Sequence, residues 1–185
     1  MLTILRKQKI TPKKYEVGDQ IHLTINNYKY TATAIKRETN GMLFWLDSCL
    51  NDKKRYLKRH GRNFDGDWED TDLRKFLQKL VNHVSVKLKN EMIPFENGDY
   101  FRLLTREEIM KNHRANKNTD RWIPFLDDRS MRMKSWNGNS SYYWLQTKST
   151  EDNMFDIMDG WGTIYCGGDY PDAENGVVPA FLLKD

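Results

Sequence analysis

Hydrophobic and polar residues alternate near the start of the chain in the way that half-buried strands require. Residues 17–25 (VGDQIHLTI) and 28–35 (YKYTATAI) both alternate. Asn26-Asn27 between them tolerates the positive φ angles of a tight hairpin turn. A second turn signal, Asn40-Gly41, precedes the more apolar residues 42–46. The pattern predicts an antiparallel three-stranded start.

A helical period follows over residues 71–92, where apolar residues recur at intervals of three and four. Thr71 is placed to act as the N-cap, and the residues at 82–85 predict a break into two helices. Another helix is predicted from Thr105, which forms a capping-box pattern with Glu108, to about residue 112. The apolar stripe, which we interpret as core, is Leu73, Phe76, Leu77, Leu80, Val81, Val84 and Leu88.

The second half of the chain is rich in aromatic residues and turn formers. The pattern predicts short strands at 99–104, 142–147, 152–156 with Met158, 160–167 and 177–183. Pro179 favours a sheet edge or a bulge for the last of them. Residues 52–67 and 112–122 are predicted loops. Short antiparallel strands and long loops around two or three helices indicate an α+β fold.

A chain of 185 residues with 12% aromatic and 30% charged residues fits one globular domain and not a disordered segment. Within residues 1–185 we distinguish an N-terminal arm (1–14), N-terminal strands (15–50), a basic loop with helices (51–112) and a loop-rich aromatic half (113–185). No apolar run reaches the roughly 18 residues of a membrane span, and the N-terminus lacks the pattern of a secretory signal. We therefore expect a cytoplasmic protein or a component of a phage virion.

Charge is distributed unevenly along the chain. Residues 1–63 hold 14 Lys and Arg against 5 Asp and Glu, whereas residues 64–185 hold 16 against 21. The basic stretch between 53 and 62 is the candidate for nucleic-acid binding, with cations for phosphates and a tyrosine for base stacking. Its residues are Lys53, Lys54, Arg55, Tyr56, Lys58, Arg59 and Arg62. The alternative is a solvated loop and strand edges protected by lysine.

Four stretches of the sequence form a series: WEDTDLRKFLQ (68–78), DYFRLLTREE (99–108), YYWLQT (142–147) and GVVPA (176–180). In order and spacing they resemble the motifs of a domain family of unknown function from Firmicutes and their phages. YYWLQT (142–147) resembles W-W-L-R-(S/T), and GVVPA (176–180) resembles G-V-R-P-A. WEDTDLRKFLQ (68–78) and DYFRLLTREE (99–108) resemble two upstream motifs of that family. Gln146, Val178, Phe76 and Gln78 depart from the family pattern. The family is distantly similar to formylglycine-generating enzymes, so the resemblance implies a C-type-lectin-like domain.

In lectin-like folds the loop-rich half usually holds the ligand. The resemblance therefore implies that the binding site of this chain lies in its C-terminal half. The candidate binding surface comprises Trp136, Asn137, Asn139, Trp161, Asp169, Tyr170 and Asp172. The alternative is that most of the tryptophans are core residues. The calcium motifs of sugar-binding lectins are absent, and formylglycine-type catalysis needs two C-terminal cysteines where only Cys166 is present. We expect no metal and no cofactor.

Other residue types offer little chemistry. Cys49 and Cys166 are predicted to be reduced and mostly buried, with a disulfide between them left open, and the four histidines lack zinc-ligand spacing. The acidic run at 63–72 is best explained as a helix N-terminus that collects carboxylates. Asp156 and Asp159 could flank a sugar, but nothing in the sequence fixes their separation and surface carboxylates are the commoner outcome.

The sequence therefore predicts a non-enzymatic binding module that recognises a protein partner through aromatic loops. One alternative is a phage accessory protein that associates with nucleic acid, or blocks a host defence, through the basic N-terminal third. Another is a calcium-independent carbohydrate-binding protein. The oligomeric state is left open.

Overall fold

The computed structural model describes residues 14–54, 56, 66–111, 121–149, 153–165 and 167–185. It begins with an antiparallel meander of β1 (Gln20–Ile25), β2 (Tyr28–Glu38) and β3 (Gly41–Leu46). Asn26 and Asn27 form the first turn with φ angles of 50° and 68°, which confirms the predicted hairpin. β1 starts three residues later than predicted because the amide of Asp19 bonds to the carbonyl of Glu16 in a preceding turn.

The C-terminal strand β9 (Ala180–Leu183) lies inside the main sheet, whose order is β1-β2-β3-β9-β4. It pairs with β3 on one side and with the short β4 (Met92–Ile93) on the other. The edge position predicted from Pro179 is therefore wrong. Proline does not interrupt the ladder because it precedes the strand, where its carbonyl accepts a hydrogen bond from the Leu46 amide at 3.1 Å.

The helices follow the predicted pattern with shorter bounds. The break near 82–85 is confirmed, because α1 (Asp72–Leu80) is followed by a 3-10 turn (Val81–His83) and α2 (Val86–Glu91). Thr71 caps α1 by accepting a hydrogen bond from the Arg74 amide. The capping box of Thr105 and Glu108 begins α3 (Arg106–Ile109).

Helix α3 ends three residues earlier than predicted. The carbonyl of Glu108, which would accept from residue 112 in a longer helix, accepts from the amide of Ile123 at 2.9 Å instead. The remaining short helices of the described chain are η1 (Trp68–Asp70), η3 (Pro124–Asp127) and α4 (Arg129–Arg132).

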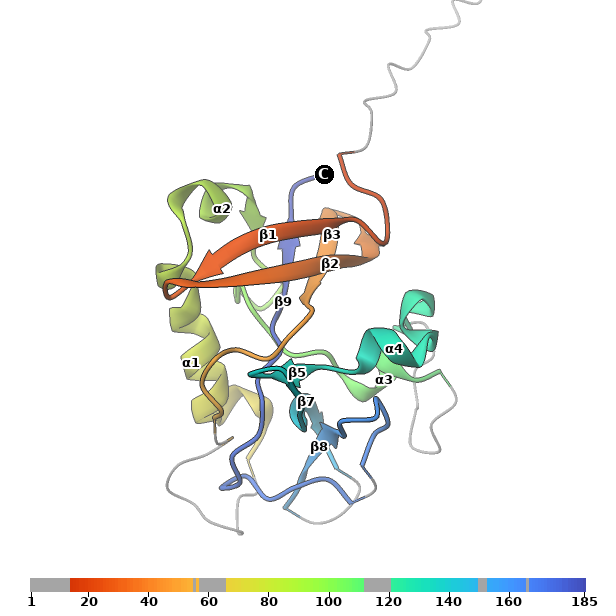
Figure 1. The fold of residues 1–185 in the computed structure, drawn as a ribbon. Helices are drawn as coiled ribbons and strands as arrows, with labels where there is room; N and C mark the ends of the chain where they lie inside the picture. Colours follow the sequence, from red (N-terminus) through yellow and green to blue (C-terminus); the bar gives the residue numbers. More distant parts are fainter. Residues whose placement is uncertain (1–13, 55, 57–65, 112–120, 150–152, 166) are drawn as a thin grey trace, which may run out of the picture.

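The C-terminal half contains two small hairpins between long loops. They are β5 (Ser135–Trp136) with β6 (Asn139–Ser140), and β7 (Tyr143–Lys148) with β8 (Phe155–Met158). Figure 1 shows β1, β2 and β3 in one half of the molecule and β5, β7 and β8 in the other, with the C-terminal segment running from the loop-rich half into the sheet. This mixed strand and helix structure is an α+β fold.

Two predicted strands are absent from the described residues. Residues 99–104 do not pair along their length with any one strand. Arg102 forms a single bridge to Ala180, whereas the Leu104 carbonyl accepts a hydrogen bond from the Gln146 amide. Residues 160–165 form a turn and one isolated bridge, from Ile164 to Met158. Asp152 and Cys166, which also belonged to predicted strands, lie outside the described residues.

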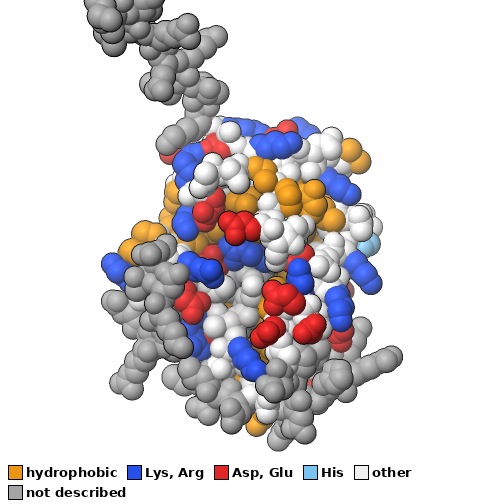
Figure 2. Space-filling view, turned by 180° about the vertical axis from the view of Figure 1, so that it is seen from behind, with side chains coloured by type: hydrophobic (Ala, Val, Ile, Leu, Met, Phe, Trp, Pro, Cys, Tyr) orange, Lys and Arg blue, Asp and Glu red, His pale blue; other side chains and the backbone are white. Residues whose placement is uncertain are grey.

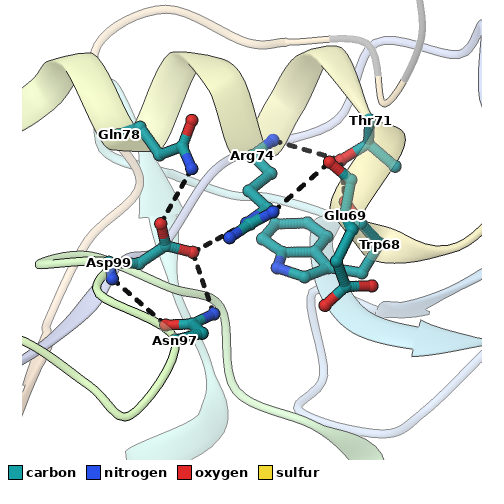
Figure 3. Close-up of polar contacts among 7 residues, drawn as sticks. All are labelled: Trp68, Glu69, Thr71, Arg74, Gln78, Asn97 and Asp99. Atoms are coloured by element: carbon teal, nitrogen blue, oxygen red, sulfur yellow. Dashed lines mark hydrogen bonds and ion pairs between the residues drawn. The ribbon is translucent and has the colours of Figure 1, made fainter.

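A buried carboxylate joins helix α1 to the segment that follows β4. Asp99 is 4% exposed and accepts hydrogen bonds from Arg74 Nε at 2.7 Å, Gln78 Nε2 at 2.9 Å and Asn97 Nδ2 at 3.0 Å. Figure 3 shows Arg74 and Gln78 reaching from the same side of α1 toward this carboxylate. Because buried charges need partners, Asp99 fixes the position of α1 against the rest of the domain.

Asp99→Ala removes the acceptor shared by these donors and leaves the Arg74 guanidinium without its counter-charge. We expect the free energy of unfolding to fall by about 3 kcal/mol, measured by chemical denaturation. Asp172→Ala is the matched control, because Asp172 is exposed and its loss should change stability by less than about 0.5 kcal/mol. Equal effects of the two substitutions would show that Asp99 has no special role.

Candidate functional site

The turn that follows β8 presents the most exposed aromatic side chain among the described residues. Asp159 Oδ1 accepts hydrogen bonds from the amides of Trp161 at 2.9 Å and Thr163 at 2.8 Å, which closes the turn. The Arg129 side chain on α4 donates to the Trp161 carbonyl and to Thr163 Oγ1. Gly162 adopts a φ of 73° where a Cβ would lie 2.8 Å from the Arg129 carbonyl oxygen. The backbone is therefore fixed while the Trp161 side chain is 71% exposed.

Four other exposed apolar side chains are considered with this turn. Two are an aromatic pair whose rings are in contact, and two belong to the end of α4, which is hydrogen-bonded to the turn. Tyr142 and Tyr165 are about half exposed, and their rings meet edge to face with centroids 6.1 Å apart. Met131 and Met133 are exposed at the end of α4, the helix that supplies Arg129. We call these five side chains the Trp161 surface: Met131, Met133, Tyr142, Trp161 and Tyr165.

The β5–β6 hairpin contributes a second group of predicted site residues. Asn137 and Asn139 are exposed at its tip, where Asn137 has a φ of 50°. Trp136 is half-buried and donates from Nε1 to the Asn51 carbonyl at 2.6 Å. The hairpin lies close to the Trp161 turn, because a Cβ on Gly160 would be 2.9 Å from the Cβ of Ser140.

The remaining predicted site residues lie away from this group. Asp169 exchanges backbone hydrogen bonds with Phe155 at the start of β8, whereas Trp161 follows the end of that strand. A strand of this length separates the two points by about 10 Å. Asp169 also accepts from Asn175 Nδ2 at 2.8 Å, Tyr170 is half-buried and Asp172 is exposed. The structure therefore divides the predicted surface into two parts.

Tyr56, which was predicted to stack on nucleic-acid bases, is a core residue with no exposed area. Its ring stacks on Phe155 at a centroid distance of 3.7 Å, and its hydroxyl donates to the Leu145 carbonyl at 2.9 Å. The prediction of base stacking is wrong, because the Tyr56 ring is buried and cannot reach a nucleic-acid base. The basic residues around it in the sequence do not indicate that the tyrosine points inward.

The lysines beside Tyr56 rest on aromatic rings. Lys53 Nζ lies 4.9 Å from the ring centroid of Trp136, and Lys54 Nζ lies 5.0 Å from that of Phe76. Arg55, Lys58, Arg59 and Arg62 lie outside the described residues. On the face drawn in Figure 2, the coloured acidic and basic side chains are interspersed and do not separate into patches of one sign.

A buried ion pair occupies the position where paired catalytic acids were considered. Arg106 on α3 bonds to Asp156 on β8, and both side chains are almost completely buried. Burial raises the pKa of Asp156 to about 6, although the Arg106 guanidinium opposes that shift. Asp156 is thus neither a surface carboxylate nor available to a sugar, while Asp159 is committed to the turn. The geometry does not support a pair of glycosidase acids.

Cys49 is buried, as predicted, and burial raises the pKa of its thiol to about 11. Such a thiol is a poor nucleophile at neutral pH. Lys134 nearby is also buried, with its Nζ 3.7 Å from the ring centroid of Trp45, and burial lowers the pKa of Lys134 to about 8. Cys166 lies outside the described residues.

A charged hollow of about 440 Å³ lies between the end of β2 and the start of α3. Its charges are largely paired, since Arg102 binds both oxygens of Glu108 at 2.6 and 2.7 Å and Lys36 binds Glu38 at 3.0 Å. Burial raises the pKa of Glu108, but the Arg102 charge outweighs burial and the net shift is downward. This internal neutralisation favours a structural role for the hollow.

Sequence reasoning missed the contribution of α4. Met131 and Met133 alternate with Ser130, Arg132 and Lys134, a polar context that does not distinguish an exposed methionine from a buried one. Arg129 carries no sequence signal either, because its role depends on a turn 32 residues further along the chain.

Comparison of the chain with protein-family models, curated proteins and solved structures finds no match. Within the described residues, no cluster of His, Cys, Asp and Glu has the makings of a metal site. None of the described helices combines the length and the apolar character that crossing a membrane requires.

Asp156→Asn tests the cost of the buried carboxyl group. A pKa of about 6 in the folded protein against 3.8 in the unfolded chain means that the folded state holds the proton more tightly. The associated stability is fully present below pH 4 and is lost as the pH rises to about 6. Asparagine cannot ionise, so the unfolding free energy of the variant minus that of the wild type should rise by up to about 3 kcal/mol between pH 4 and pH 7.

Urea denaturation of both proteins across this pH range measures the difference between their unfolding free energies. The test is the change of this difference with pH, which a pH-independent effect of the substitution on stability does not alter. A difference that falls with rising pH would mean that attraction to Arg106 outweighs desolvation of the carboxylate.

Proposed function

We propose that the chain is a non-enzymatic binding module that recognises a protein partner through the Trp161 surface. The observation that carries the proposal is the 71% exposure of Trp161 on a turn whose backbone is fixed by Asp159 and Arg129. A tryptophan left in water forgoes a large gain from burial, and an ordered turn spares a partner the entropy of fixing it. Rigid exposed aromatics are the typical anchors of protein interfaces.

The neighbours of Trp161 support a protein partner. Methionine adapts its shape to different surfaces, and Met131 and Met133 are exposed on and just after α4, the helix that is hydrogen-bonded to the Trp161 turn. Tyr142 and Tyr165 add large contact areas with few rotatable bonds. The Arg129 guanidinium is already engaged by the turn, so the five side chains of the Trp161 surface offer mainly apolar contacts.

We also infer that the α+β domain is C-type-lectin-like and belongs with the Firmicutes and phage family that its motifs resemble. The motif residues support this inference because they form the scaffold: Arg74 binds Asp99, and Trp144 Nε1 donates to the Lys54 carbonyl at 2.8 Å. Lectin-like folds place ligands on the loop-rich half, which here carries Trp161. Fold analogy alone does not assign a ligand.

The experiment compares the wild-type chain with Trp161→Ala in affinity capture from a Firmicutes lysate treated with nuclease. Tyr28→Ala is the matched control, because Tyr28 is a 50% exposed aromatic residue on the β1–β2 hairpin. We expect a protein captured in stoichiometric amount by the wild type and by Tyr28→Ala. Trp161→Ala should reduce its affinity by about 10-fold to 100-fold, as loss of an interface anchor does.

The alternatives give different results. A nucleic-acid-associated role, supported by the charge excess of residues 1–63, predicts capture that nuclease abolishes and salt weakens steeply. A calcium-independent glycan role predicts that free sugars release the captured material. Equal capture by the wild type and Trp161→Ala would refute recognition through the Trp161 surface, provided that circular dichroism shows both proteins folded.

A further inference from the structure

Strand β1 forms one edge of the main sheet, and part of this edge is uncovered by any described residue. The Ala34 amide bonds to the Asp19 carbonyl, and hydrogen-bonded pairs alternate along an antiparallel ladder. Gln20 and His22 therefore direct their backbone N–H and C=O groups away from β2. The far end of the strand is covered, because Ile25 bridges to Val84.

This edge lacks the usual protection against pairing with another strand. The sequence of β1, QIHLTI, contains no charged residue and no proline, and its register with β2 shows no bulge. Natural edge strands are normally blocked by one of these devices or by a covering segment. Ile21 beside the free edge is half-buried, whereas Leu23 and Ile25 on the same face of the sheet are buried.

The charges around β1 suit a second copy of the same strand in antiparallel orientation. The exposed carboxylates of Glu16 and Asp19 lie just before the strand, and the exposed ammonium group of Lys29 lies beside its end, where Lys29 pairs with Thr24. Antiparallel pairing brings the acidic end of one copy to the basic end of the other. A strand without charges meets its copy without repulsion.

We propose that β1 is a self-association surface, at which two copies of the chain pair antiparallel about a two-fold axis at Ile21. In this register Gln20 of each copy pairs with His22 of the other through backbone hydrogen bonds. The two Ile21 side chains then face each other at the closer, non-hydrogen-bonded spacing and cover the half-buried position. The paired residues Gln20–His22 lie outside the end of the strand that the Ile25–Val84 bridge covers.

Light scattering and sedimentation test this assignment from about 10 µM to about 1 mM, since a short pairing gives a weak dimer. The mass should rise from 22.1 kDa toward twice that value with concentration, and the rise should weaken in high salt. His22→Pro removes an outward N–H that β2 does not use and should stay monomeric. Thr24→Pro is the matched control outside the register and should dimerise like the wild type.

Ile21→Cys provides a second test that does not depend on proline. Facing residues at a non-hydrogen-bonded position are within disulfide range, so mild oxidation should link two chains, whereas Thr24→Cys and the wild type should not link. A wild type that remains at 22.1 kDa at the highest concentration, or a dimer that His22→Pro leaves intact, would overturn the proposal.

Discussion

The pairing of the C-terminal strand with the N-terminal meander is the constraint on which the structure depends. β9 lies between β3 and β4, so its backbone groups are satisfied on both sides only when residues more than 130 positions apart in sequence meet. The indole of Trp45 donates to the Val178 carbonyl just before β9 and reinforces the junction. Because the chain enters β9 from the loop-rich half, this strand also fixes where that half joins the sheet.

Buried polar contacts then hold together the parts of the chain that the main sheet does not connect. Asp99 collects three donors and anchors α1, while Arg106 and Asp156 join α3 to β8. Loops that carry exposed side chains need such fixed points, because short hairpins alone have little stability of their own. The Trp161 turn shows the result, with its backbone fixed at both ends by one carboxylate and one guanidinium.

The candidate surfaces differ in how they arise from this framework. The Trp161 surface presents side chains on fixed loops, whereas the free edge of β1 presents backbone groups. The two require different partners, since aromatic anchors need a complementary pocket and an open edge needs an extended strand. They can be occupied independently, because Figure 1 shows β1 and β8 in opposite halves of the molecule, and the Trp161 turn directly follows β8.

The sequence by itself determined the local elements: the Asn26-Asn27 hairpin, the capped helix α1 and the capping box of α3. These depend on residues close together in the chain, so periodicity, caps and turn formers are sufficient to predict them. Only the tertiary structure decided that β9 is internal, that Tyr56 is buried and that Trp161 is exposed. Burial depends on which distant segments meet, and the type of a side chain does not encode that.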